Sequence, residues 1–346
     1  MKRYFYLDAL RLFAMIGVIA QHSIEENDIN LFTLHRGSWL FINIISIFSR
    51  ISVPIFVMIS GAVILPRFGS RNIIEFYTKS ARKLLIPLFI WSLVYLQYSH
   101  KLSSYQDALS IFYIPSYYHL WFVYMIFGLY LSSPFISMML VQANKNSILI
   151  FLCLWLLFYS IFPLLQIDGN RFALWQSGLF STMIGWFILG YVISQYNLFF
   201  IEKQKLVTLI SVYCLIFIML YLGQYIIFLI YGVRSSYYCQ DSPLAILFTA
   251  FTFYLAKRLL NNIKNFNFNN LFMCNFSMLI YNVYFVHALI LNLYKSRIDS
   301  YHLLPWSLAI MLIVLTSITS FGLILTCHFL ERKYKRYFNN NKLNTY

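Results

Sequence analysis

Long apolar segments recur along this chain of 346 residues, and each is close to the length that a helix needs to cross a bilayer. A transmembrane helix takes about 20 predominantly apolar residues. The chain is 60% hydrophobic and 11% charged, which leaves too little polar surface for a soluble domain of this size. The sequence therefore predicts an all-α polytopic membrane protein with about ten spans. They lie near 5–24, 39–65, 84–99, 119–141, 147–166, 177–195, 205–231, 243–260, 271–294 and 304–330.

The positions of Lys and Arg predict the orientation of these spans. Cytoplasmic segments of membrane proteins are enriched in positive charge. With the N-terminus inside, 18 of the 26 basic residues fall in cytoplasmic segments and six in outer loops. We therefore expect both termini in the cytoplasm. This placement also argues against nucleic acid as the partner of the formal charge of +15 and favours contact with anionic membrane lipid.

The connections between the spans are too short to hold a separate core, the longest being 66–83, 100–118 and 231–242. The sequence thus predicts a single integral-membrane domain over 1–346, with spans from about 5 to 330 and a basic cytoplasmic tail at 331–346. Five cysteines show no paired spacing, and we expect neither a disulfide framework nor a metal site.

The first span carries three ionisable residues, Asp8, Arg11 and His22. Charged groups are costly inside a bilayer and usually mark functional positions. Arg11 and His22 are eleven residues apart, which is close to three helical turns, so they share one face about 16 Å apart along the axis. Asp8 precedes Arg11 by three residues and can pair with it. The first span is therefore the predicted location of the chemistry.

Other polar groups in or beside spans have two interpretations. An isolated histidine such as His287 is as readily a hydrogen-bonding partner between helices as a functional group. His119 and Trp121 lie at the predicted outer end of the fourth span, where aromatic residues are expected in any case. They can equally line an acceptor site, because aromatic rings stack on sugars.

Five sequence blocks occur in a fixed order along the chain. The first is Asp8 with Arg11, ten further residues and His22. Together, the five blocks resemble those of the acyltransferase-3 family of integral-membrane enzymes, which O-acylate bacterial surface sugars and other acceptors. The resemblance extends from residue 6 to about 290. The other blocks are RISVPIFVMISG (50–61), YTKSARKLLIP (77–87), HLWFVY (119–124) and IYNVYFVH (280–287).

The resemblance implies an acyl-CoA-dependent O-acyltransferase in the bacterial cytoplasmic membrane. The expected co-substrate is acyl-CoA, with acetyl-CoA as the favoured interpretation, and it would enter from the cytoplasm. No bound cofactor is expected. The acceptor would be a surface polysaccharide or a lipid-linked glycan precursor. Many family members carry a carboxylate eleven residues after the histidine, where this chain has Thr33. Which acid orients His22 therefore stays open; Glu25 and Glu26 are nearest, and Glu26 at i+4 would share its face.

Roles for individual residues follow from the chemistry. An imidazole titrates near neutral pH, so His22 can take the proton of an acceptor hydroxyl and return it to the leaving thiolate. Arg11 can stabilise an oxyanion or bind the phosphates of the donor. Pro54 and Gly61 are expected to bend the second span near Arg50 and open room for a ligand. The predicted donor-binding residues are Arg50, Lys79, Arg82 and Lys83, and the predicted acceptor-binding residues are His119, Trp121 and His287.

The basic residues between the second and third spans can also act as topology determinants, and this role is compatible with donor binding.

Two other functional classes compete with the acyltransferase interpretation. A transporter or flippase for a glycan intermediate would account for the spans and the buried charges, but not for the five ordered blocks. In a non-catalytic subunit of a glycan assembly complex, His22 and Arg11 would be packing residues only.

Overall fold

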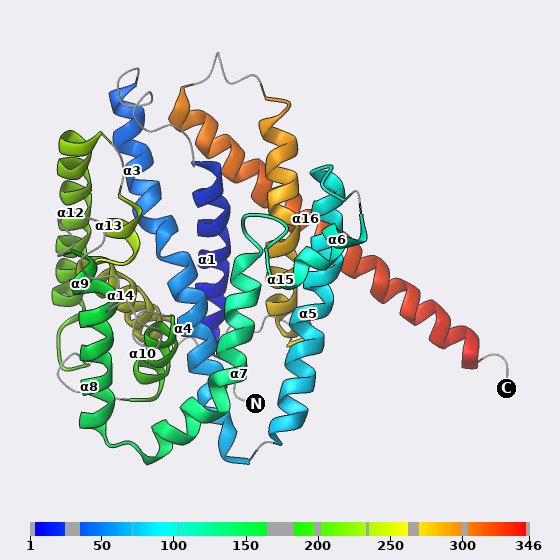
Figure 1. Ribbon diagram of the computed structural model, residues 1–346, viewed down its shortest axis with the longest axis horizontal. Coiled ribbons are helices and arrows are strands. Elements are labelled where there is room, and N and C mark those ends of the chain that lie inside the picture. The colour runs from blue at the N-terminus through cyan, green and yellow to red at the C-terminus, as the bar shows by residue number, and fades with distance from the viewer. Residues whose placement is uncertain are drawn as a thin grey trace. The chain divides into compact units, whose positions relative to one another are not determined.

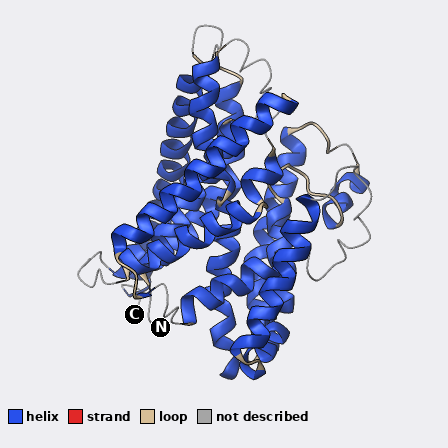
Figure 2. Cartoon of the chain, turned by 90° about the vertical axis from the view of Figure 1, so that its left-hand side faces the viewer, coloured by secondary structure: helices blue, strands red, loops and turns tan. Residues whose placement is uncertain are grey.

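The computed structural model describes residues 4–24, 35–70, 72–102, 104–164, 183–196, 202–232, 235–261, 270–298 and 304–343. Within these ranges the chain forms helices and loops and no strand (Figure 2). The predicted all-α class is confirmed.

Each predicted span contains a helix. The α-helices are α1 (Phe5–Ser23), α3 (Arg36–Arg50), α4 (Ser52–Ile64), α5 (Ile73–Tyr98), α6 (Tyr105–Leu109), α7 (Trp121–Gln142), α8 (Lys145–Leu156), α9 (Phe162–Leu164), α10 (Ile184–Gln195), α12 (Leu206–Tyr231), α13 (Ser236–Gln240), α14 (Pro243–Leu260), α15 (Asn270–Lys295) and α16 (Pro305–Leu343). Short 3₁₀ turns follow α4 and α6, and a π-helical turn joins α8 to α9.

Among the described residues, five helical stretches are long and apolar enough to cross a membrane. At other predicted spans, α8 and α10 are shorter, and α1 and α5 carry charged side chains. The protein is therefore an integral-membrane protein, and the full set of ten spans and its orientation stay predictions. The five stretches are Arg36–Phe68, Trp121–Gln142, Leu206–Tyr231, Tyr238–Leu260 and Pro305–Glu331.

The chain divides into two compact units. Unit 1 contains Met1–Ser52, Gly223–Ser235 and Leu260–Tyr346, and unit 2 contains Val53–Leu222 and Ser236–Leu259. In unit 1, α1 packs against α3, α15 and α16. The C-terminal ends of α1 and α15 lie at the same end of unit 1 as the N-terminal ends of α3 and α16, at the top of Figure 1.

Small residues allow the helices of unit 1 to approach closely. A Cβ atom added to Gly17 would overlap the Ser52 hydroxyl and lie 3.5 Å from Ser49 Cα. Small residues are common at helix contacts in membranes, where dispersion contacts and hydrogen bonds replace the hydrophobic effect as the driving force. Gly17 therefore fixes the depth at which the end of α3 meets α1.

The second predicted span is interrupted at Ile51, between α3 and α4. Proline at position i removes a hydrogen bond to residue i−4 and clashes with that carbonyl, so Pro54 explains a break next to Arg50. At Gly61 the second span is not interrupted, because α4 continues through it to Ile64. In unit 2, a Cβ atom on Gly61 would overlap the Phe187 carbonyl of α10. Gly61 thus brings two helices together and does not open space.

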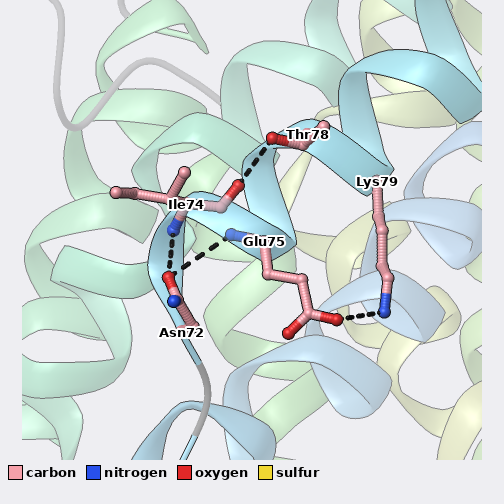
Figure 3. Close-up of polar contacts among 5 residues, drawn as sticks. All are labelled: Asn72, Ile74, Glu75, Thr78 and Lys79. Atoms are coloured by element: carbon pink, nitrogen blue, oxygen red, sulfur yellow. Dashed lines mark hydrogen bonds and ion pairs between the residues drawn. The ribbon is translucent and has the colours of Figure 1, made fainter.

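Helix α5 begins well before the predicted start of the third span at residue 84. The Asn72 side chain caps its N-terminus by accepting hydrogen bonds from Ile74 N at 2.9 Å and Glu75 N at 3.4 Å (Figure 3). Thr78 Oγ1 donates to Ile74 O within the first turns. The cap places the basic residues that follow on the same continuous helix as the apolar segment.

Candidate active site

Asp8 and Arg11 form an ion pair on α1, as predicted. Arg11 Nη1 donates to Asp8 Oδ1 at 2.5 Å, and Asp8 is only 1% exposed. A buried carboxylate without a cation would cost several kcal/mol, on the order expected for charges in a low-dielectric interior. The pair therefore keeps Asp8 inside unit 1 and fixes the position of the Arg11 guanidinium.

His22 lies in the last turn of α1, and its ring packs against His287 of α15. The two ring centroids are 5.7 Å apart and the planes differ by 25°. His287 is fully buried, and its Nδ1 lies 2.6 Å from Tyr284 O. A carbonyl oxygen can only accept, so this contact places a hydrogen on Nδ1 of His287. The structure thus brings together two histidines that are 265 positions apart in the sequence.

A second residue of α15 holds His22 through its backbone. Lys295 Nζ donates to His22 O at 3.1 Å. The last four carbonyls of a helix lack intrahelical partners, and a cation there also interacts favourably with the helix dipole. Helix α15 therefore fixes both the ring and the carbonyl of His22. Sequence reasoning missed Lys295, because a lysine in a predicted outer loop gives no local signal of a contact so distant in the sequence.

Arg50 is placed by the contact between α1 and α3. It follows Ser49, whose Cα lies beside Gly17 of α1. Arg11 is six residues before Gly17 and His22 is five residues after it. The last turn of α3, with the half-buried Arg50, therefore lies at a depth between Arg11 and His22. Glu26 lies outside the described residues, as do Glu25 and Thr33.

In unit 2, His119 is 2% exposed and is surrounded by tyrosine rings. Its ring lies edge-on to Tyr95, Tyr117 and Tyr118, with centroid distances of 5.1, 5.7 and 5.5 Å. Trp121, which begins α7, is 40% exposed. The HLWFVY block therefore combines a tightly packed histidine with an indole ring that a ligand can reach.

Three predicted donor-binding residues of unit 2 lie on α5. Lys79, Arg82 and Lys83 are all exposed, and their spacing of three and four residues puts them on one helix face. Lys79 also pairs with Glu75 one turn earlier (Figure 3). This face offers a basic surface to an anion or to membrane lipid.

Comparison with known families adds to this geometry. A family model described as an acyltransferase domain matches residues 4–325. The match includes α1, α15 and every described residue singled out above. Comparison with curated proteins gives no match, and neither does comparison with solved structures. The chain therefore belongs to the acyltransferase-3 family, and the protein is an integral-membrane acyltransferase.

Proposed function

We propose that this protein transfers an acetyl group from acetyl-CoA to a sugar hydroxyl of a surface polysaccharide or its lipid-linked precursor. The proposed location is the bacterial cytoplasmic membrane, with both termini inside. The main support is the environment of His22. Its ring and its carbonyl both contact α15, and His22 lies on α1, the helix that also carries the ion pair of Arg11 with Asp8.

His22 is the proposed general base. It takes the proton of the acceptor hydroxyl as that oxygen attacks the thioester carbonyl. The new C–O bond forms, the C–S bond breaks, and the proton passes from the imidazole to the departing thiolate. Packing against His287 limits the orientations of the ring, which lowers the entropic cost of reaching the reactive geometry.

The distance along α1 favours one of the two roles for Arg11. An oxyanion donor must lie about 3 Å from the carbonyl oxygen, beside the base. Arg11 lies three helical turns away, about 16 Å along the axis from His22. We therefore propose that Arg11, oriented by Asp8, binds a phosphate of the donor, whose long pantetheine arm joins its phosphates to the thioester.

The remaining residues are assigned on the same basis. Arg50, at an intermediate depth in unit 1, is a proposed donor contact. The exposed basic face of α5, with Lys79, Arg82 and Lys83, is proposed to attract the same polyanion. For the acceptor, His287 is next to the base, and the exposed ring of Trp121 is suited to stacking on a sugar. Within unit 2, His119 is proposed to support the start of α7, where Trp121 lies, through its tyrosine contacts.

The first test follows labelled acetyl-CoA with purified protein in lipid vesicles, in the presence of a glycolipid extract from the host. Both donor breakdown and label transfer are measured. We expect His22→Ala to lose about 10²- to 10⁴-fold in rate, as for other general bases. His328→Ala, a histidine on α16, is the matched control and should retain activity. Full activity of His22→Ala contradicts the mechanism, and movement of a glycan without donor breakdown would favour a transporter.

A further inference from the structure

A hollow of about 510 Å³ opens at one end of unit 1. Two helix ends form it, since its residues come from the first turns of α3 and from the start of α16. None of the described residues that were predicted for the active site lines it. Its lining residues are His35, Gly37, Ser38, Phe41, Leu304 and Trp306.

The hollow lies at the same end of unit 1 as His22. A buried cluster of Ile24, Ile42 and Ala309 joins the three helices there. Ile24 is two residues beyond His22, Ile42 follows Phe41, and Ala309 is one turn beyond Trp306. Figure 1 shows the ends of α1, α3 and α16 on one side of this unit. A ligand bound in the hollow would therefore be near the end of the helix that carries the proposed base.

One part of the hollow is aromatic. Phe41 and Trp306 meet edge to face, with centroids 5.8 Å apart and planes at 66°. Each ring is 39% exposed. Aromatic faces carry partial negative charge and attract polarised C–H groups. Two partly open rings at this angle form a corner that suits a flat ligand with C–H groups on one face.

The lining of the hollow also has polar groups. Ser38 is only 4% exposed, and within the described residues no hydrogen bond engages its hydroxyl. The first N–H groups of a helix have no intrahelical partners, and His35 provides no side-chain cap for α3. The Ser38 hydroxyl and the first N–H groups of α3 are therefore available to a hydrogen-bonding ligand in the hollow.

These two parts together select the ligand class. A sugar ring has an apolar C–H face and hydroxyl groups at its edge, and the volume lies within the usual range of small-molecule sites. A lipid chain would leave Ser38 without a partner. The phosphates of acyl-CoA would need cations, and among the described residues that line the hollow there is neither lysine nor arginine.

We propose that this hollow binds one sugar ring of the acceptor glycan. Trp306 and Phe41 contact its C–H face, while Ser38, His35 and the first turn of α3 bind its hydroxyl groups. This assignment as an acceptor subsite rests on the proposed function, but sugar binding itself can be measured without catalysis.

Gly37 provides a test that spares the fold. A Cβ atom added there meets no atom within 4 Å, so the side chain of Gly37→Trp starts in open space beside the hollow and is expected to fill it. Gly322→Trp on α16 is the matched control, since its Cβ also meets nothing within 4 Å. The probes are methyl glycosides of glucose, galactose, rhamnose and N-acetylglucosamine, with the protein in lipid nanodiscs free of glycosidic detergent. Binding is measured by saturation-transfer NMR.

We expect binding of at least one glycoside to the wild type, to His22→Ala and to Gly322→Trp, and its loss in Gly37→Trp. Trp306→Ala should weaken binding about tenfold, because it removes an aromatic face that the sugar contacts, and Trp306→Tyr should restore most of the binding, because it returns an aromatic ring. Binding that survives in Gly37→Trp, or no binding to the wild type, overturns the proposal. Loss of a bound spin-labelled phospholipid in Gly37→Trp would instead identify a lipid site. Because His22→Ala is expected to retain sugar binding, failure of the proposed catalytic mechanism can be distinguished from failure of the proposed sugar subsite.

Discussion

Both units of this protein contain close glycine contacts, but they differ in what lies beside them at the candidate site. Unit 1 holds an ion pair between Asp8 and Arg11 and a pair of packed histidines in its interior. In unit 2, glycines bring helix backbones into contact, as Gly61 does with Phe187. Polar contacts inside a membrane protein are costly unless every group is satisfied, whereas glycine contacts depend on shape alone. The comparison indicates that substitutions at the ion pair and the histidine pair of unit 1 should affect chemistry first, whereas substitutions at the glycine contacts of unit 2 should affect folding first.

After the loss of activity expected for His22→Ala, the largest expected effect is on stability in unit 2. Gly61→Val would place side-chain atoms against the Phe187 backbone, which cannot move without separating α4 from α10. Overpacking of this kind costs about 1–3 kcal/mol or more. Thermal unfolding of purified protein should show a clear loss of stability. Gly128→Val, whose Cβ meets no atom within 4 Å, is the control, and equal stability of the two variants would contradict this view of unit 2.

A large effect on donor use is expected at the ion pair of unit 1. Arg11→Lys keeps the charge but loses bidentate geometry, so the KM for acetyl-CoA should rise about tenfold. Asp8→Asn should act in the same direction, because it releases the guanidinium. With S-acetylpantetheine, which lacks the nucleotide phosphates, Arg11→Lys and the wild type should react alike. A defect of equal size with both donors would show that Arg11 does not act through phosphate.

A smaller effect is expected at the backbone contact of His22. Lys295→Ala removes the donor to the His22 carbonyl, and we expect kcat to fall about three- to tenfold with little change in KM. Lys295→Arg should recover most of the rate, which a loss caused only by misfolding would not do. Arg297→Ala is the matched control, because it removes an exposed charge two residues away. The positioning role is wrong if the two alanine variants have the same kcat.

The smallest expected effect is at the surface of unit 2. The pair between Lys79 and Glu75 is exposed, so Lys79→Gln should change the free energy of unfolding by less than about 0.5 kcal/mol. If the basic face of α5 attracts the donor, the same variant should raise the KM for acetyl-CoA modestly, and more at low salt. Glu75→Gln breaks the same pair but leaves the cation, so it separates the two effects. A KM unchanged at all salt concentrations would remove Lys79 from the donor site.

Local sequence patterns predicted much of unit 1. The spacing of Asp8, Arg11 and His22 predicted their relation on a single helix, because helical periodicity is a short-range property.

In unit 2, the sequence also contains the signal for the start of α5, since Asn72 followed by Glu75 is a capping pattern, but hydropathy favoured the later start at residue 84. The roles of Gly17 and Gly61 were not readable, because a glycine looks the same in sequence whether it bends a helix or packs one.

Contacts between distant segments were beyond prediction. His287 was correctly placed on a late helix, but a single sequence contains no signal that its ring meets His22. The same holds for Lys295 and for the hollow beside Trp306, which depends on how the ends of α3 and α16 meet. These features arise from tertiary packing, and propensity and spacing do not encode it.

The contact between Lys295 and His22 also has a consequence for biosynthesis. Its two residues are separated by 273 positions, so the first helix leaves the ribosome long before its partner exists. At about 5–20 residues per second, α1 would wait on the order of tens of seconds for α15. During that interval neither His287 nor Lys295 is present to hold the histidine. A chain released early would therefore carry the histidine without either partner, and the proposed activity would arise only when synthesis is nearly complete.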